Sequence, residues 1–139
     1  MSGLSFANSG DKLLLTNIAG WGQFTLGFRA FSGCSNMTCT ATDIPNLDTN
    51  LAEAFRYCTN FNSDLSGWDV SGVQIMTDMF LDSAFSTENY DLALAAWSGL
   101  SLQPNVSFHA GTAKYSEISA KAILVNAPNN WIITDGGQL

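Results

Sequence analysis

The sequence predicts an α/β fold in which short strand–turn–helical coils stack as a leucine-rich-repeat-like solenoid. The first observation is a phenylalanine that recurs at a nearly constant spacing, at Phe31, Phe55 and Phe80. The second is the tripeptide Asp43-Ile44-Pro45, which has a counterpart about one period later in Asp69-Val70-Ser71. A period of this length is typical of leucine-rich repeats. Such a coil cannot bury its apolar face alone, so neighbouring coils must cover it.

The repeat also predicts which side chains form the core. Two further pairs at the same spacing are Leu51 with Met76 and Ala54 with Met79. Stacked coils place equivalent side chains above one another, so we expect an internal ladder of apolar residues. The expected ladder consists of Phe31, Cys34, Phe55, Cys58, Met76, Met79 and Phe80.

Each coil is expected to hold one strand and one helical return. The strand comes after the cysteine, because side chains of alternating polarity occupy 37–41 in the first copy and 61–65 in the second. Met37, Cys39 and Ala41 face inward in the first copy, and Phe61, Ser63 and Leu65 in the second. The segments 51–55 and 76–80 have the composition of a helical turn and form the returns.

We expect a single domain, 1–139, with three parts. Residues 1–30 form an N-terminal β cap, since Leu4 and Phe6 alternate with polar residues and glycines divide the rest of this segment into short extended pieces. Residues 31–85 hold the repeat coils. Residues 86–139 form an α/β C-terminal cap, with helices at 88–98 and 116–126 and strands at 106–108 and 131–134. Ser86 is the expected N-cap of the first helix.

Composition narrows the classes of partner. The formal net charge is −7 and only 12% of the residues are charged, and the five basic residues never cluster. A chain of this kind offers no phosphate-tracking patch, so we expect no nucleic-acid binding, and no apolar run is long enough for membrane insertion. The profile suits an extracellular, cell-surface or virion protein. The N-terminus lacks the pattern of a signal peptide, so we expect export by another route, a mature or excised piece, or a viral origin.

Three cysteines, Cys34, Cys39 and Cys58, are an odd number at low density. A disulfide framework normally uses an even number. We therefore expect free, buried thiols that pack as small apolar residues.

Several long motifs resemble a known family. The stretch 61–71, FNSDLSGWDVS, together with 76–80, MTDMF, resembles the repeat of about 25 residues in BspA-type leucine-rich-repeat surface proteins. The segments 33–36 and 41–47 resemble a more variable copy, and 86–91 and 130–137 are similar to the family's C-terminal segment. The resemblance spans about residues 10–137.

This resemblance implies a non-enzymatic surface module without cofactors. Relatives act as bacterial adhesins, and similar domains occur in phage and other viral proteins. We expect a recognition or adhesion module that binds a surface glycan or protein, in its most specific form a virion or tail-associated host-recognition protein. The alternative is a purely structural decoration or assembly protein that contacts other virion subunits and binds no receptor.

Candidate binding residues lie in and beside the central repeat. An exposed Trp68 ring beside Asp69 suits sugar stacking, whereas the structural alternative has Trp68 packed at a corner and Asp69 capping a turn. Asp64 and Asp69, with Asp43, offer carboxylate oxygens that could bind calcium, but they lack the dense spacing of a calcium loop. Capping of local backbone is therefore the preferred interpretation, and no metal is expected.

The remaining candidates lie just before that stretch. Arg56, Tyr57 and Asn60 form a possible protein-binding rim, against the alternative of ordinary solvated surface. His109 is the only histidine and has no partner at the spacing of a metal site or a catalytic triad. We therefore expect no enzymatic activity. The sequons at Asn36 and Asn105 carry no weight without a secretion signal.

Overall fold

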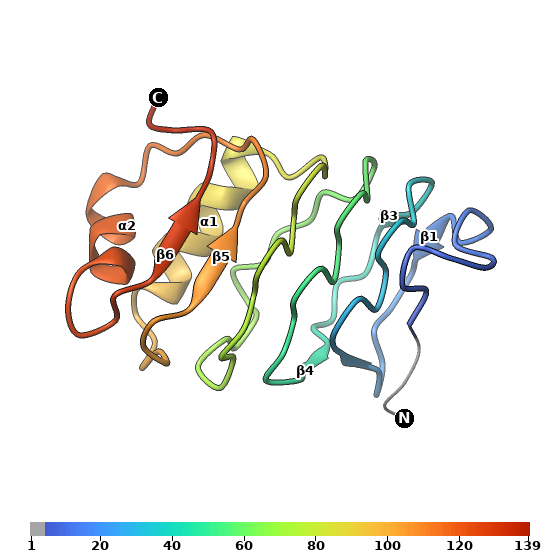
Figure 1. Cartoon of the computed structure of the whole chain (residues 1–139), viewed down its shortest axis with the longest axis horizontal. Coiled ribbons are helices and arrows are strands. Elements are labelled where there is room, and N and C mark those ends of the chain that lie inside the picture. The colour runs from blue at the N-terminus through green and yellow to red at the C-terminus, as the bar shows by residue number, and fades with distance from the viewer. Residues whose placement is uncertain (1–4) are drawn as a thin grey trace.

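The computed structural model describes residues 5–139 as an array of short parallel strands and turns that ends in two helices (Figure 1). Its strands pair in parallel as three separate two-stranded sheets, β1–β3, β2–β4 and β5–β6. The elements are β1 Asn17–Ile18, β2 Thr25–Leu26, β3 Thr38–Cys39, β4 Asn46–Leu47, α1 Thr87–Trp97, β5 Ser107–His109, α2 Ile118–Val125 and β6 Ile132–Thr134.

The predicted fold class is wrong. Both helices of the described residues lie after residue 86, so the repeat region has no helical return. Its strands are two residues long and fall in separate sheets, and no strand forms at 61–65. The segments 51–55 and 76–80 are hydrogen-bonded turns. The protein is therefore not a leucine-rich-repeat-like solenoid of strand–turn–helical coils.

Left-handed backbone explains why the returns are not helical. Arg29, Glu53 and Asp78 have φ angles of 54°, 55° and 53°. A right-handed helix cannot pass through such a residue, so each segment becomes a series of turns with bonds from one N–H to the carbonyl three residues earlier. The left-handed conformation recurs four residues further on, at Gly33, Tyr57 and Asp82.

Backbone hydrogen bonds join the equivalent turn segments. The N–H of Phe31 donates to the carbonyl of Ala54 at 2.9 Å, and the N–H of Phe55 donates to the carbonyl of Met79 at 3.0 Å. The N–H of Ala54 instead donates within its own turn, to the carbonyl of Leu51 at 3.1 Å. Alternate N–H groups thus bond within a segment and to the next one, which leaves few of them unsatisfied. The period in the sequence marks these laterally bonded turns.

A column of aromatic rings fills the space behind the turns. Phe55 stacks between Phe31 and Phe80, with ring centroids 5.8 and 5.5 Å away and planes within 14° of its own. Phe61 stacks on Phe55 at 4.1 Å. All seven expected ladder residues are buried, each at most 4% exposed. Because Phe55 stacks on Phe31, Phe61 and Phe80, a change of its ring disturbs all three neighbours.

The C-terminal part begins with α1, close to the expected range 88–98. The hydroxyl of Ser86 accepts the N–H of Asn89 at 3.2 Å, as an N-cap does. α1 buries Tyr90 and Trp97 against Phe108 of β5, which lies in front of it in Figure 1. Side-chain contacts between helix and strand therefore close this end of the aromatic column.

Polar contacts then fix α2 and the last strand. Asp91 of α1 accepts the N–H groups of Ser116 and Glu117 just before α2. Asp135 accepts the Tyr90 hydroxyl and the Lys121 ammonium, both at 2.7 Å. Burial raises the pKa of Asp135, but the hydrogen bonds from Lys121, Tyr90 and the Gly137 N–H, together with the Lys121 charge, outweigh it and hold the pKa below its usual value.

The N-terminal part is only partly described. Leu4, half of the expected alternation, lies outside the described residues, while the N–H of Phe6 donates to the carbonyl of Ala30 at 3.0 Å. Residues 5–8 thus lie beside the first turn segment. Neither described helix is long and apolar enough to cross a membrane.

The cysteines are all free thiols. Cys34 and Cys58 are fully buried, and burial raises the pKa of Cys34 to about 11 and that of Cys58 to about 12. The Cys58 thiol donates to the carbonyl of Phe31 at 3.0 Å. Cys39 in β3 is only half-buried. The two buried thiols therefore act as packing groups.

We expect Phe55→Ala to lower the free energy of unfolding by about 3–5 kcal/mol, because it opens a cavity between two stacked rings. Urea denaturation followed by tryptophan fluorescence measures the change. Phe28→Ala is the control, since that ring is 49% exposed and its loss should cost far less. Equal stability of the two variants would contradict the aromatic column.

We also expect only one thiol of the native protein to react rapidly with a water-soluble aromatic disulfide reagent. Cys39 is the reactive one, because Cys34 and Cys58 lack both access and the thiolate form at neutral pH. The thiolate released from the reagent should correspond to one thiol per chain in the native protein. Adding denaturant should release two more equivalents. Cys39→Ser should abolish the fast phase alone.

Candidate functional site

The six binding residues expected from the sequence do not form one site. Trp68 is 3% exposed, with its ring edge-on to Trp21 at 5.8 Å and also close to Phe55. It offers no open face on which a sugar could stack. Asp64 and Trp68 line a hollow with Asp43, whereas Asp69 lines a different one.

The three aspartates accept backbone N–H groups, Asp64 and Asp69 within their own turns and Asp43 from an earlier segment. Asp64 accepts the N–H of Ser66 at 2.8 Å, and Asp69 accepts that of Ser71 at 3.1 Å. Asp43 accepts the N–H groups of Trp21 and Gly22, and these bonds lower its pKa. Within residues 5–139, no three His, Cys, Asp or Glu side chains gather closely enough to hold a metal ion. The carboxylates of Asp43, Asp64 and Asp69 therefore stabilise backbone turns.

Arg56 and Tyr57 lie together, with the guanidinium 4.7 Å from the centroid of the tyrosine ring. Asn60 is exposed a few residues further on. A second pair of the same kind lies in the preceding turn segment, where the Arg29 guanidinium is 4.8 Å from the centroid of the Phe28 ring. Two arginine–aromatic pairs thus occupy neighbouring segments.

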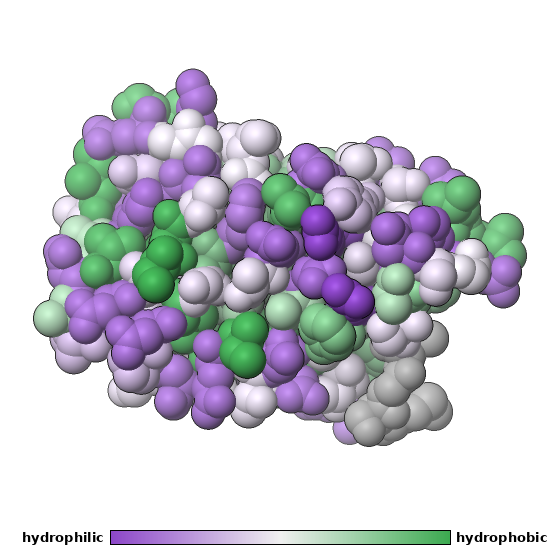
Figure 2. All heavy atoms as spheres, in the orientation of Figure 1, coloured by the Kyte–Doolittle hydropathy of each residue, from purple (hydrophilic) through white to green (hydrophobic). Residues whose placement is uncertain are grey.

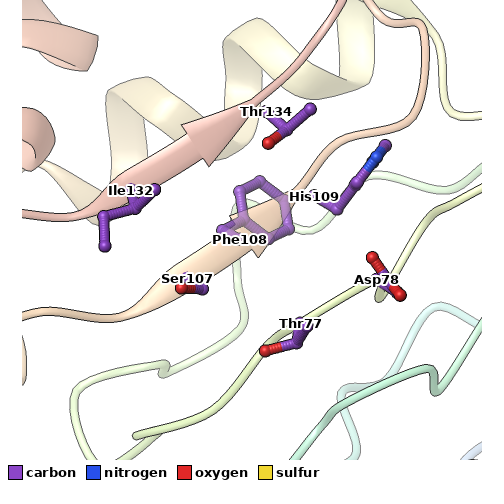
Figure 3. Close-up of a pocket in the computed structure, with 7 residues that line it drawn as sticks. All are labelled: Thr77, Asp78, Ser107, Phe108, His109, Ile132 and Thr134. Atoms are coloured by element: carbon purple, nitrogen blue, oxygen red, sulfur yellow. The ribbon is translucent and has the colours of Figure 1, made fainter.

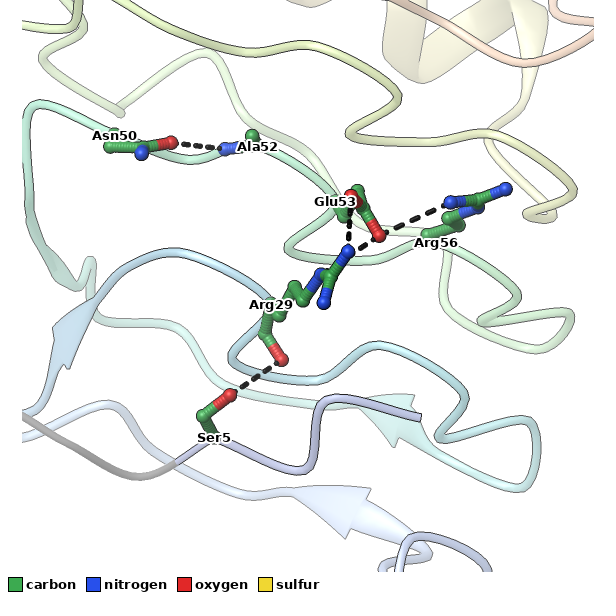
Figure 4. Close-up of polar contacts among 6 residues, drawn as sticks. All are labelled: Ser5, Arg29, Asn50, Ala52, Glu53 and Arg56. Carbon is green, nitrogen blue, oxygen red and sulfur yellow. Dashed lines mark hydrogen bonds and ion pairs between the residues drawn. The ribbon is translucent and has the colours of Figure 1, made fainter. Parts of the chain in front are cut away.

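Glu53 connects the two arginines (Figure 4). Its carboxylate accepts two hydrogen bonds from Arg29, both at 3.0 Å, and one from Arg56 at 3.2 Å. The bond from Arg29 is the main reason that the Glu53 pKa lies below its usual value, and Arg56 adds to it against the opposing effect of burial. We call Arg29, Glu53 and Arg56 with the rings of Phe28 and Tyr57 the arginine cluster.

A shallow hollow of about 200 Å³ lies beside this cluster, over β5 and β6 (Figure 3). It comes next to Glu53 because the Glu53 N–H donates to the carbonyl of Thr77 at 2.8 Å. Its lining combines hydroxyl, carboxylate and imidazole groups with one exposed isoleucine. The lining residues are Thr77, Asp78, Ser107, Phe108, His109, Ile132 and Thr134.

The histidine of this hollow has a defined tautomer when neutral. Its Nδ1 accepts the N–H of Gly111 at 3.0 Å, so the ring proton lies on Nε2. Gly111 has a φ of 68° and a Cβ there would approach the carbonyl of Phe80 at 2.8 Å, so glycine is required. The ring is therefore positioned by the backbone and presents a donor.

Sequence reasoning missed the main polar residues of this face. Arg29, Glu53 and Asp78 lie two positions before the three repeating phenylalanines and share their spacing along the chain. We call these three the charged column. The signal was present, but a repeat of changing residue type is harder to recognise than a repeated phenylalanine. His109 has no such repeating counterpart in the sequence.

The comparisons with known proteins agree with a repeat family. The model of the family described as "Mycoplasma protein of unknown function, DUF285" matches residues 28–115. The chain belongs to this family. The match covers the turn segments, the arginine cluster and most of the hollow, and it supports the resemblance to a surface-repeat family without selecting the BspA-type proteins. No curated protein and no solved structure matches the chain.

We expect Glu53→Gln to lower the free energy of unfolding at neutral pH by about 1 kcal/mol, the upper range for partly exposed ion pairs. The pKa of Glu53 is lower in the folded state than in the unfolded state, where it is 4.5. Its carboxylate therefore stabilises the fold at pH values above 4.5, and this contribution is lost as the pH falls through the folded-state pKa. Urea denaturation should therefore show the two proteins converging in acid.

The control for this comparison is Asp82→Asn, which removes an exposed carboxylate from a left-handed position that asparagine tolerates. It should change stability little at either pH. A stability gap between wild type and Glu53→Gln that stays constant down to acid pH would show that the carboxylate charge is not what Arg29 and Arg56 require.

Proposed function

We propose that the protein is a non-enzymatic recognition module whose arginine cluster and adjoining hollow bind a glycan or protein on another surface. The observation that carries the proposal is the arrangement of the cluster: one carboxylate holds two arginines, each against an aromatic ring, on adjacent segments. Side chains already fixed in place lose little conformational entropy on binding.

The composition of the cluster supports this role. Arginine and tyrosine are enriched among the residues that dominate binding energy at protein interfaces. Arg29 and Arg56 are two of only five basic residues in a chain of net charge −7, so this region differs in charge from most of the surface. Charge that differs locally from the rest of the molecule orients an approaching partner.

The side chains that could act in catalysis are also placed in a way that favours a binding role. His109 uses Nδ1 for a backbone N–H, and Cys34 and Cys58 have raised pKa values inside the core. A nucleophile requires a nearby base and access to substrate. We therefore propose recognition rather than catalysis, without a cofactor.

The finer assignment is drawn from the motifs. The stretch 61–71 and the segments around it resemble BspA-type surface proteins, which supports an adhesion role at an extracellular, cell-surface or virion location. A virion or tail-associated host-recognition protein is the most specific form of this proposal. Nucleic acid is a poor partner, because the chain has only five basic residues at a net charge of −7 and Glu53 offsets part of the charge of Arg29 and Arg56.

The test is binding to a panel of immobilised glycans and to intact bacterial and eukaryotic cells. We expect wild type to bind at least one surface and Arg56→Ala to bind it about tenfold or more weakly, as loss of one dominant interface residue does. Lys114→Ala is the matched control, because it removes one positive charge from an exposed position elsewhere. A wild type that binds none of these surfaces, or an Arg56→Ala that binds as Lys114→Ala does, would contradict the proposal.

Exposed apolar side chains favour the structural alternative. Ile118 and Ile123 of α2 and Ile132 of β6 are 54%, 50% and 63% exposed. Figure 2 shows hydrophobic residues gathered over these two elements at one end of the molecule. Exposed apolar surface of this kind marks contacts between subunits. A decoration or assembly protein would use this end and would require no receptor.

Sedimentation velocity tests the structural alternative. If this end joins subunits, wild type should form oligomers at micromolar concentration and Ile132→Lys should be a monomer, because a buried lysine without a partner opposes association. Thr42→Lys, at an exposed position in the repeat region, is the control and should associate as wild type does. A monomeric wild type at all concentrations would exclude self-assembly through this end.

A further inference from the structure

The register of the strands places the lining of the hollow in two rows. His109 pairs with Thr134 across β5 and β6, and the bridge between Met76 and Phe108 places Thr77 beside His109. One row therefore runs Thr77, His109, Thr134 across three neighbouring segments, about 4.8 Å apart. Two residues back along the strands, Ser107 pairs with Ile132 in a second row.

The polar groups of these rows have unused hydrogen-bonding capacity. Within residues 5–139, four of the lining side chains have no hydrogen-bond partner in the protein: the hydroxyls of Thr77, Ser107 and Thr134 and the carboxylate of Asp78. The nearby Glu53 carboxylate, in contrast, is bonded to both arginines of the arginine cluster. His109 has its Nδ1 occupied and its Nε2–H available. These five side chains converge on one hollow, so a single small ligand in it can bond to several of them at once.

We propose that this hollow is a subsite for one sugar ring of a neutral glycan. The Asp78 carboxylate accepts from ring hydroxyls, the His109 imidazole donates, and the threonine hydroxyls do either. Ile132, 63% exposed, supplies an apolar wall for the C–H face of the ring. The inference rests on the proposed recognition function and names the chemical class that its hollow binds.

Other ligand classes fit the lining less well. The lining of the hollow contains the Asp78 carboxylate and no lysine or arginine, so a phosphate or sulfate in it is repelled. A metal ion would have a single carboxylate and a single imidazole, and no group of three ligating side chains occurs within residues 5–139. The volume of about 200 Å³ is below that of sites for drug-sized ligands and suits a single ring.

The experiment is an amide NMR titration of the full chain with the methyl glycosides of glucose, galactose, mannose and N-acetylglucosamine. We expect weak, millimolar binding by at least one of them, because hydrogen bonds exchanged with water contribute little net free energy. The shifts should be largest at Thr77, Asp78, His109 and Thr134. Asp78→Asn should weaken binding at least tenfold, since a charged acceptor is lost.

Asp82→Asn is the matched control. Both aspartates have left-handed backbone, with φ angles of 53° and 55°, so asparagine is tolerated equally at both positions. Asp82 lies outside the hollow, and its variant should bind as wild type does. The inference is overturned if none of the four glycosides shifts these amides, if the shifts occur elsewhere, or if Asp78→Asn binds as tightly as Asp82→Asn.

The same variants separate this inference from the proposed function. If Asp78→Asn keeps wild-type adhesion to glycans and cells while Arg56→Ala loses it, the sugar subsite is wrong and the recognition function stands. If a glycoside binds in the hollow but the wild type adheres to no glycan surface or cell, the recognition function fails and the subsite stands. Shifts produced by lysine methyl ester but by no glycoside would also overturn the sugar subsite, because the ligand would then be a cation.

Discussion

The alternation of backbone hydrogen bonds in the turn segments is the constraint on which the rest of the structure depends. One N–H bonds within its own segment and the next bonds to the neighbouring segment, as at Ala54 and Phe55. This pattern fixes the lateral register, and the register in turn brings Phe31, Phe55 and Phe80 face to face. The aromatic column then excludes water from the bonds that positioned it. Ring stacking and lateral hydrogen bonding therefore share one register.

The period of the repeat was visible in the sequence, but the conformation of each repeat was not. Spacing shows which residues are equivalent, whereas helix or turn is decided by φ at single positions such as Glu53 and Asp78. Glutamate and aspartate at those positions are compatible with a helical turn by composition, so composition predicts the wrong local structure. Their left-handed conformation is imposed by hydrogen bonds to neighbouring segments, a tertiary effect that local propensity does not contain. The N-cap at Ser86 depends only on local sequence, and α1 begins close to where that signal places it.

In the candidate site too, features set by local sequence could be predicted and features set by tertiary contacts could not. Arg56 and Tyr57 were recognisable because they lie beside a repeating cysteine, and they do form part of the arginine cluster. Trp68 is misleading as a sugar platform, since an aromatic residue between a glycine and an aspartate can point inward when the chain turns, and here it packs on Trp21. The hollow over β5 and β6 combines residues from positions 77 to 134, brought together by strand register alone. No local motif contains that information.

The charged column has a consequence for how proteins of this architecture can diverge. Arg29, Glu53 and Asp78 hold equivalent backbone positions with nearly equal φ angles, yet their side chains differ in length and sign. The backbone bonds at these positions do not involve the side chains, so each residue can vary among the types that tolerate a left-handed backbone while the aromatic column stays intact. In the proposed recognition function, the order of charges along the column, here positive, negative, negative, is a feature that sets ligand selectivity without involving the aromatic column. Two proteins with the same core could discriminate between ligands through these three residues alone.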